Sequence, residues 1–296
     1  MLSPRILISG VVLIALTVVA SPAASQDRDR PLRFAPRIQV AFRSSAAIKP
    51  EVDLRSEIER LGLAVRDQGA NRGTCSVFAT TFLIEYHEAR TKKMKDLDLS
   101  EEYLNWAKNR ANKTDFDGGF FKDIIHGYQE FGMVPIKDMP YQAAFHPKHP
   151  DTPKPAVIAQ GKEFARYPFT FIKQWDNQKG MSENELKATK EALSGGHPVA
   201  TGIWWLQNFE TVTIERVPLM KEYPRKDNTN SDPSKNPMFD GHSIDLVGYH
   251  EGKEFPGGGY FIFRNSFGPG FGHDGYGFVS FKYIRDYSND AIRIER

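Results

Sequence analysis

The sequence predicts an α+β protein in which a mainly helical part precedes a sheet-forming part. From Cys75 to Phe131 the chain carries amphipathic stretches with few breaks at Pro or Gly, as helices do. From Gly241 onward it shows short apolar runs separated by Gly-rich turns, which is typical of strands. No internal repeat is visible, so this segregation of helices and strands favours an α+β arrangement.

The first 25 residues have the layout of an export signal. Arg5 precedes an apolar run over 6–20, and small residues follow it up to Ser25. A basic start, a short apolar core and small residues before a cleavage point are typical of a secretory signal peptide. We therefore predict a signal peptide over 1–25 and a secreted or periplasmic mature protein, with an uncleaved anchor as the alternative. No later run is long enough to cross a bilayer, so no membrane contact is expected after cleavage.

The next residues predict an extended arm and then a series of helices. The arm covers 26–52 and is polar, and the folded domain is expected over 53–296. Ser100 is a predicted N-cap, and Gly132 is expected to end a helix. The helices expected in this part are Asp53–Arg60, Cys75 to about Arg90, Leu97–Arg110 and Phe120–Phe131.

The remaining elements are mostly strands. A Pro-rich loop over 138–155 contains His146 and His149, whose spacing is too weak a signal to predict a metal site. Ser182 and Glu185 form a capping-box pattern for a helix over 182–193. A long polar loop is expected over 221–240. The predicted strands are Phe164–Ile172, Val199–Trp205, Ser243–Tyr249, Gly259–Arg264 and Gly275–Phe281.

Composition narrows the class of protein. Hydrophobic residues make up 40% of the chain and aromatics 12%, which is enough for a substantial core. The formal net charge is +2, and no basic stripe interleaved with aromatics is present. Nucleic acid is therefore not an expected partner.

Cys75 is the only cysteine and lies where a polar loop meets a predicted helix. Unpaired backbone N–H groups and the helix dipole favour a thiolate at a helix N-terminus. A single cysteine has no partner for an internal disulfide, although exported proteins usually pair theirs. Two interpretations stay open from this residue alone: a small buried apolar side chain, or a thiol kept for its chemistry.

A histidine and an asparagine in the C-terminal part favour the second interpretation. A thiol hydrolase needs a nucleophile, an imidazole that moves the proton, a group that orients the imidazole, and donors for the oxyanion. His242 begins an apolar strand directly after Gly241, and Asn265 ends the next strand. An antiparallel pairing of these two strands would bring Asn265 beside His242.

At this point the sequence resembles the papain-like cysteine peptidases. The resemblance covers roughly residues 53–290 and rests on six blocks in the family's order. These are the Gln68–Cys75 segment with its helix, Leu-Ser-Glu-Glu at 99–102, Phe-Asp-Gly-Gly at 116–119, the segment 191–199, Gly-His at 241–242 with its strand, and Asn-Ser-Phe-Gly at 265–268 with the Gly-rich turn after it.

The resemblance implies both a fold and site residues. The implied fold has a helical N-terminal lobe, about 65–160, and a β-barrel-like C-terminal lobe, about 161–296, with the active cleft between them. The implied roles are Cys75 as nucleophile, His242 as general base and acid, Asn265 as the orienting group and Gln68 as an oxyanion donor. Phe267 takes the place of the family's shielding Trp. Gly118 and Gly119 would pair with the substrate backbone, and Asp240 and Ser243 would line a pocket.

The chain departs from the family pattern at several positions. The interval from Gln68 to Cys75 is one residue longer than usual, and Ser76 replaces the Trp that normally follows the nucleophile. The cysteines of the family's bridge beside the site would correspond to Arg72 and Phe116, so a bridge-free branch is expected. Asp245 is unusual within an apolar strand, because a buried carboxylate needs a partner.

The favoured function is hydrolysis of peptide bonds through an acyl-thioester intermediate, acting on a peptide or protein substrate. Two alternatives remain: another acyl-transfer or amidase reaction on the same site, and an inactive papain-like binding protein. No cofactor or metal is expected, and the protein is expected to be a monomer.

Overall fold

The computed structural model describes residues 48–142, 144–145, 152–206, 210–222 and 238–295. All of these residues belong to a unit that spans Phe42–Arg296. The predicted signal peptide, most of the predicted arm, the His146–His149 loop and most of the loop over 221–240 lie outside the described residues, so these predictions remain predictions.

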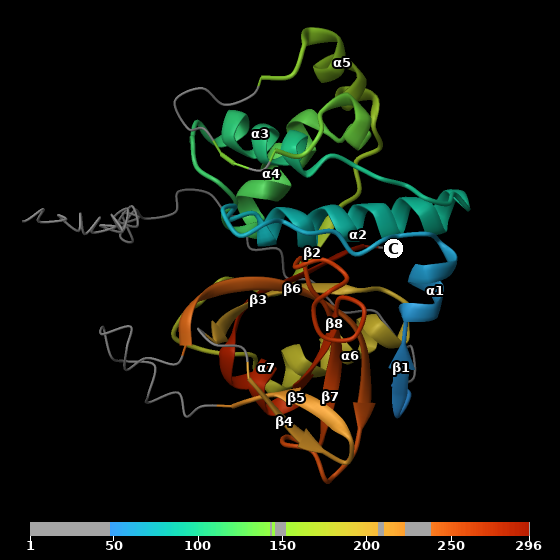
Figure 1. The fold of residues 1–296 in the computed structure, drawn as a ribbon, viewed down its shortest axis with the longest axis vertical. Helices are drawn as coiled ribbons and strands as arrows, with labels where there is room; N and C mark the ends of the chain where they lie inside the picture. The colour runs from blue at the N-terminus through green and yellow to red at the C-terminus, as the bar shows by residue number, and fades with distance from the viewer. Residues whose placement is uncertain (1–47, 143, 146–151, 207–209, 223–237, 296) are drawn as a thin grey trace, which may run out of the picture. The chain divides into compact units, whose positions relative to one another are not determined.

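The helices of the first part pack around α2. These elements are α1 (Arg55–Arg60), α2 (Cys75–Lys92), α3 (Glu101–Asn112), α4 (Phe121–Phe131), the short 3-10 helix Ile136–Asp138 and α5 (Pro155–Glu163). Helices α3 and α4 pack on one side of α2, and the sheet packs on the other (Figure 1). Because α2 is covered on both sides, buried side chains such as Val77, Phe82 and Ile84 point in several directions around its axis.

The predicted helix ends are confirmed. The Ser100 hydroxyl accepts a hydrogen bond from Tyr103 N at 2.9 Å and so caps α3. Gly132 ends α4 with a φ of 75°, a conformation that glycine adopts without steric cost. The capping box of α6 (Glu183–Ser194) forms as predicted between Ser182 and Glu185.

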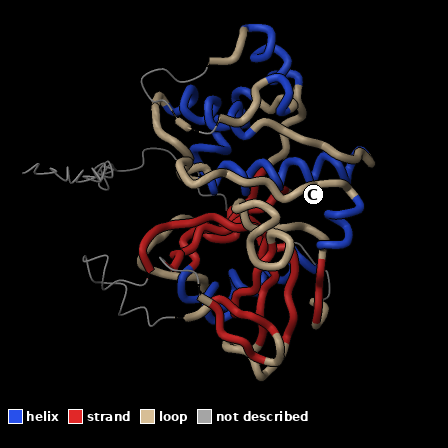
Figure 2. The backbone as a smooth tube through the Cα atoms, in the orientation of Figure 1, coloured by secondary structure: helices blue, strands red, loops and turns tan. Residues whose placement is uncertain are grey.

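The strands form one nine-stranded sheet within the described residues, ordered β2-β9-β3-β6-β7-β8-β5-β4, with β1 also paired to β6. Figure 2 shows the strands in red below the helical part. Their bounds are β1 (Glu51–Asp53), β2 (Phe169–Lys173), β3 (Val199–Leu206), β4 (Thr211–Ile214), β5 (Val217–Met220), β6 (Met238–Glu251), β7 (Gly259–Arg264), β8 (Tyr276–Ser280) and β9 (Ser288–Ile294). Helix α7 (Phe281–Tyr287) connects the last two strands. The α+β class is therefore confirmed.

Two features of the sheet differ from the prediction. The described sheet is open and is not closed into a barrel, because β2 and β4 lie at opposite ends of the strand order. Strand β2 begins at Phe169 and not at Phe164, because the carbonyls of Ala165 and Tyr167 accept hydrogen bonds from α4 side chains and Pro168 follows them. The sequence analysis also missed α5, α7, β4, β5 and β9.

The register of the central strands sets the position of the site. Strand β6 is antiparallel to both β3 and β7, with His242 opposite Ile203 and Asp245 opposite Arg264. Asn265 follows the last residue of β7 directly. Strand β6 thus runs through the middle of the sheet, against α2, with the His242 end near the end of β7.

We expect Ser182→Ala to lower the free energy of unfolding by about 1 kcal/mol, because it removes the hydrogen bond that Glu185 N donates to Ser182 Oγ and the one that Ser182 Oγ donates to Glu185 Oε2. Urea denaturation measures the change. Asn184→Ala is the matched control, since Asn184 is exposed in the first turn of the same helix and should cost less than about 0.5 kcal/mol. Equal losses in the two variants would contradict the capping role.

Candidate active site

Cys75 is the first residue of α2 and is half-buried. Thr74 occupies the N-cap without a side-chain cap, because its hydroxyl bonds Tyr141 Oη at 2.5 Å instead. The first turn of α2 contains no acidic residue. The thiol therefore lies at the positive end of an 18-residue helix, and no carboxylate in the first turn offsets that positive charge. This position favours the thiolate.

The structure brings His242 and Asn265 together as the antiparallel pairing predicts. His242 Nε2 lies 2.7 Å from Asn265 Oδ1, and both side chains are buried. Asn265 Oδ1 also accepts a hydrogen bond from Ser266 N at 2.9 Å. Because an amide oxygen only accepts, Nε2 carries the proton and the lone pair of the neutral ring lies on Nδ1.

The surroundings of His242 keep its imidazole neutral. Burial lowers its pKa to about 4, although the hydrogen bond to Asn265 acts in the opposite direction. Desolvation disfavours the charged ring more than this one bond supports it. At neutral pH His242 is therefore an unprotonated base with a fixed tautomer.

Two aromatic rings cover the His242 ring. Phe267 stacks on it with ring centroids 4.7 Å apart, and Trp205 meets it edge-on at 4.6 Å. Trp205 also contacts Phe267, with their centroids 6.0 Å apart. The sequence analysis missed Trp205. The signal was available, because antiparallel pairing of the strands ending in Trp205 and starting at His242 brings these two residues close.

Gln68 is buried, with both ends of its amide held. Its Oε1 accepts a hydrogen bond from Ser266 Oγ at 2.6 Å, and its Nε2 donates to the Arg72 carbonyl at 2.8 Å. The amide nitrogen carries two hydrogens, so one remains for a further acceptor. A turn at residues 70–71 precedes Arg72, and Gln68 lies beside the loop that follows Asn265.

Backbone hydrogen bonds join the loop before Cys75 to the loop after Asn265. Gln68 N donates to Ser266 O at 2.8 Å, and Gly268 N donates to Arg66 O at 3.1 Å. A small cavity of about 20 Å³ beside this junction is lined by Ala79 of α2 and by Asn265, among others. The N-terminal turns of α2 therefore lie against the segment that follows β7 and begins with Asn265.

Gly118 and Gly119 form a turn beside the Cys75 loop. Gly118 has a φ of 64°, and a Cβ there would lie 2.0 Å from the Gly73 carbonyl oxygen, so only glycine fits. Its N–H donates to Asn105 Oδ1 at 3.0 Å. Gly119 is half-buried, and within the described residues its N–H and C=O make no hydrogen bond. Its backbone is therefore available to pair with an extended peptide.

Of the two predicted pocket residues on β6, only Ser243 has a described side chain. Asp240 lies opposite Trp205 in the sheet, and its side chain is outside the described residues. Ser243 lies opposite Gly202 and is 8% exposed. Its side chain lines the small cavity under α2, which leaves little of it for contact with a substrate.

Comparison with known proteins gives the family. The chain matches the papain family of cysteine proteases over residues 48–292. The chain belongs to this family. The predicted resemblance and the predicted enzyme class, a cysteine peptidase, are thereby confirmed.

Curated papain-family relatives are distant in sequence. An uncharacterized peptidase C1-like protein of Acanthamoeba polyphaga mimivirus is 23% identical over 269 residues, which cover 88% of this chain and 79% of that protein. Cysteine proteinase 1 of Entamoeba histolytica is 27% identical over 217 residues, which cover 72% of this chain and 58% of that protein. The match thus spans little more than half the length of the Entamoeba protein.

Solved structures confirm the papain-like fold. Xylellain, a cysteine protease from Xylella fastidiosa, has a TM-score of 0.63 at 20% identity, covering 84% of this chain and 87% of that chain. A digestive procathepsin L from Tenebrio molitor larval midgut has a TM-score of 0.58 at 22% identity, covering 86% and 72%. In this papain-family chain no helix of the described ranges has the length and apolarity that crossing a membrane demands.

Asp245, unusual in the sequence, is a buried acid. It is 4% exposed, and its Oδ1 has no hydrogen-bond partner among the described residues. Burial raises the pKa of Asp245 well above its ordinary value, although the nearby Arg264 lowers it. Glu101, which also lines the small cavity, has a pKa raised to about 8, mainly by burial. Each of the two carboxyl groups has a cation beside it, because Arg66 pairs with Glu101 at 2.7 Å and Arg264 lies near Asp245.

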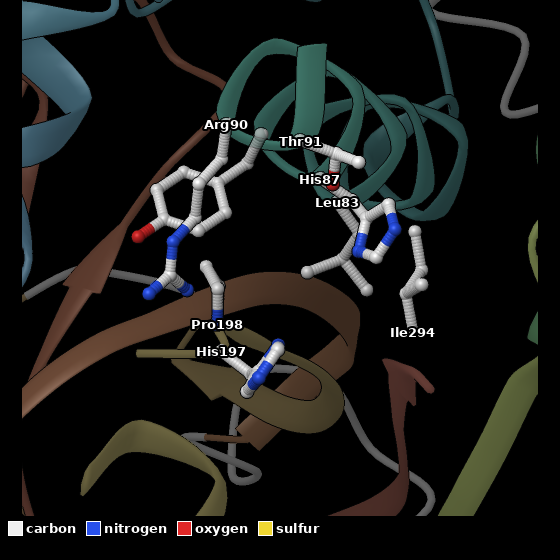
Figure 3. Close-up of a pocket in the computed structure, with 8 residues that line it drawn as sticks. Leu83, His87, Arg90, Thr91, His197, Pro198 and Ile294 are labelled. Atoms are coloured by element: carbon white, nitrogen blue, oxygen red, sulfur yellow. The ribbon is translucent and has the colours of Figure 1, made fainter. Parts of the chain in front are cut away.

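A separate cavity lies along the C-terminal half of α2. It has a volume of about 380 Å³, and Figure 3 shows Arg90, His87 and His197 around it. Burial lowers the pKa of His87, which also packs against the Tyr167 ring. Across the described ranges, no group of three or more His, Cys, Asp or Glu side chains is placed to hold a metal ion. The two histidines of this cavity therefore do not make a metal site by themselves.

We expect Phe267→Ala to raise the pKa of His242, because burial is the main cause of its low value and Phe267 covers one ring face. A titration of the imidazole signals by NMR measures the change. Trp175→Ala is the control, since Trp175 is an exposed aromatic that packs against Phe120. An unchanged pKa in the Phe267 variant would show that this ring does not keep water from His242.

Proposed function

We propose that this papain-family enzyme hydrolyses peptide bonds with Cys75 as nucleophile, His242 as general base and acid, and Asn265 as the group that orients the imidazole. The observation that carries the proposal is the buried 2.7 Å bond from His242 Nε2 to Asn265 Oδ1. It fixes the tautomer in which Nδ1 is the basic nitrogen. This is the state a base needs to take a proton from a thiol.

In the acylation step, Cys75 Sγ attacks the carbonyl carbon of the scissile peptide bond. The thiol proton passes to His242 Nδ1, the S–C bond forms, and the C=O π electrons move to the oxygen. The Cys75 backbone N–H and the remaining Gln68 Nε2 hydrogen stabilise this oxyanion. The C–N bond then breaks, and the imidazolium gives its proton to the leaving amine.

In the second step, water replaces the amine. Neutral His242 takes a proton from the water, whose oxygen attacks the thioester carbonyl. The C–S bond breaks, the imidazolium returns the proton to sulfur, and the carboxylic acid product leaves. Phe267 and Trp205 keep bulk water from the His242–Asn265 bond, so the orienting contact survives both proton transfers.

The substrate would bind as an extended strand along Gly119. The N–H and C=O of Gly119 would take two backbone hydrogen bonds, while Gly118 holds the turn against Gly73. Asp240, two residues before His242 on β6, is proposed to contribute to a polar pocket, and Ser243 is proposed to contribute only through the small part of it that is exposed. We also propose that the protein is exported, on the basis of the signal-like residues 1–25. We propose that the exported protein acts as a monomer.

The test is the rate of Cys75 alkylation by iodoacetamide as a function of pH, in the mature protein and in His242→Ala, followed by digestion of a peptide library. We expect labelling well below the ordinary thiol pKa of about 8.5, loss of that low-pH labelling in the variant, and cleaved peptides. Ordinary thiol behaviour in both proteins would contradict the proposed catalytic pair. Transfer of acyl groups to an added amine in preference to water would make the enzyme a transferase.

The pH profile gives a second test. Because the pKa of His242 is lowered to about 4, the ring is neutral above that pH and protonated below it. A protonated ring cannot accept the thiol proton, so kcat/KM should fall as pH decreases through about 4. Steady-state hydrolysis between pH 3 and 8, compared with enzyme returned to pH 7 after each exposure, separates titration from unfolding. An acid limb near the ordinary histidine pKa would contradict a desolvated His242.

A further inference from the structure

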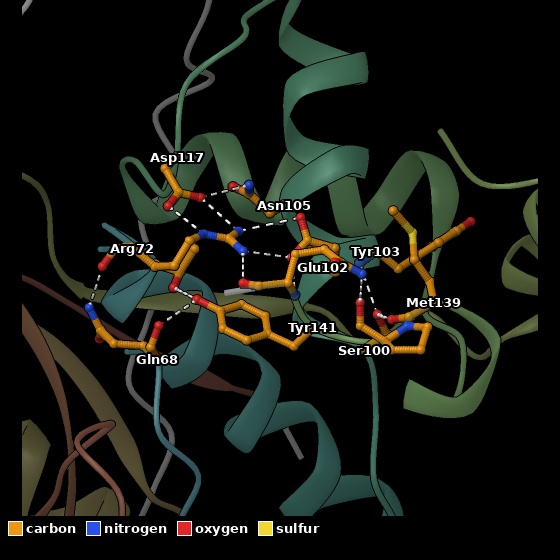
Figure 4. A network of polar contacts seen from close by, with 12 residues as sticks. Gln68, Arg72, Ser100, Glu102, Tyr103, Asn105, Asp117, Met139 and Tyr141 are labelled. Atoms are coloured by element: carbon orange, nitrogen blue, oxygen red, sulfur yellow. Dashed lines mark hydrogen bonds and ion pairs between the residues drawn. The ribbon is translucent and has the colours of Figure 1, made fainter. Parts of the chain in front are cut away.

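Arg72 is buried between the Cys75 loop and the helices. Its side chain is 0% exposed and lies between two carboxylates. Nε and Nη2 donate to the two oxygens of Asp117 at 2.8 and 3.0 Å, and Nη1 donates to Glu102 Oε2 at 2.8 Å (Figure 4). Nη1 also donates to the Gln142 carbonyl at 2.5 Å, and the guanidinium lies over the Tyr141 ring, 4.5 Å from its centroid. A planar guanidinium group that makes this many contacts is fixed in one orientation.

The backbone of the same residue holds Gln68. The Arg72 carbonyl accepts the hydrogen bond from Gln68 Nε2. The position of that carbonyl depends on the anchored Arg72 side chain, and the carbonyl in turn orients one hydrogen of the Gln68 amide. The second hydrogen is the one proposed to reach the oxyanion. Arg72 therefore determines where that donor points without touching the substrate.

Asp117 extends this constraint to the turn that is proposed to bind the substrate. Its Oδ2 accepts a hydrogen bond from Gly73 N at 2.9 Å, and its Oδ1 accepts one from Asn105 Nδ2 at 2.9 Å. Asn105 Oδ1 then accepts the Gly118 N–H. A continuous set of hydrogen bonds thus connects the Gln68 amide, the Cys75 loop and the Gly118–Gly119 turn.

We propose that Arg72 is a positioning residue for the oxyanion site, and that its ion pair with Asp117 keeps this site aligned with the substrate-binding turn in the absence of a disulfide. The inference rests on the proposed function, since it assigns Gln68 as an oxyanion donor. Arg72 acts through Gln68, so substitutions of the two residues should have effects that do not add.

A peptide aldehyde tests the inference without requiring hydrolysis. Cys75 Sγ adds to the aldehyde carbon, the S–C bond forms, and the thiol proton ends on the former carbonyl oxygen. The hemithioacetal oxygen then occupies the place of the oxyanion. Affinity is measured as protection of Cys75 from iodoacetamide. Alkylation of the free enzyme by iodoacetamide is a displacement at a saturated carbon and needs no oxyanion donor, so it reports on the thiol alone.

We expect Gln68→Ala and Arg72→Met each to weaken aldehyde binding by about 100-fold, the effect of losing one oxyanion donor. The double variant should be no more than about twofold weaker than Gln68→Ala, because both changes remove the same contact. Alkylation of the free enzymes should change less than threefold. Arg72→Lys keeps the charge but loses the bidentate bond, so its affinity should lie between those of wild type and Arg72→Met.

Arg110→Met is the matched control, since Arg110 is an exposed arginine on α3, the helix that carries Glu102, and should leave aldehyde binding unchanged. The inference is overturned if the Gln68 and Arg72 effects multiply in the double variant, if alkylation falls in parallel with aldehyde affinity, or if wild type binds no aldehyde. Peptide hydrolysis is measured separately. Its absence in a wild type that binds aldehyde through Gln68 and Arg72 would contradict the proposed hydrolysis and leave the role of Arg72 supported.

Discussion

The site depends on the hydrogen-bonded junction between the loop before Cys75 and the loop after Asn265. Residues 66–68 and 266–268 exchange backbone hydrogen bonds, and the Gln68 and Ser266 side chains join them. The proposed nucleophile comes from the first turn of α2, whereas the proposed base and its orienting amide come from β6 and the end of β7. Rate in such an enzyme requires the reacting groups to hold their positions closely. The junction supplies this, because it fixes the backbone next to the oxyanion donor and next to Asn265 at once.

The second constraint is exclusion of water from polar groups that have few partners. The His242 ring is covered by Phe267 and Trp205. Its Nε2 donates a hydrogen bond to Asn265 Oδ1. Behind Asn265, Asp245 and Glu101 have raised pKa values because of burial. Burial disfavours the charged form of all three groups, while Arg264 and Arg66 act in the opposite direction on Asp245 and Glu101. For His242 burial keeps Nδ1 unprotonated at neutral pH, and the two cations avoid the large free-energy cost of a buried, unpaired carboxylate.

Local signals in the sequence were sufficient for most helices and for the order of the site residues. Ser100, Gly132 and the Ser182–Glu185 pair marked helix ends because caps are encoded within a few residues. The open sheet was not predicted, because strand order and closure depend on contacts far apart in the chain. Arg72 was missed as part of the site for the same reason, because its partner Asp117 is distant in sequence and side-chain partners of that kind leave no periodic pattern. Trp205 is different, since the antiparallel pairing of its strand with the strand of His242 would have placed it near the imidazole.

The family resemblance places Arg72 and Phe116 at the positions of a disulfide, and this chain has neither cysteine. A disulfide between the positions of Arg72 and Phe116 would limit one distance, but it would not set the direction of the Arg72 carbonyl. Arg72 instead contacts Asp117, Glu102 and the Gln142 carbonyl, and so ties together three segments of the helical part. With the longer loop, its own carbonyl reaches the Gln68 amide. Such a network contributes little net stability if removed whole, but loss of one partner leaves a buried charge unpaired. The proposed role of the network is therefore orientation: the ion pairs hold the Arg72 carbonyl, and this carbonyl positions the Gln68 amide that is proposed to reach the oxyanion.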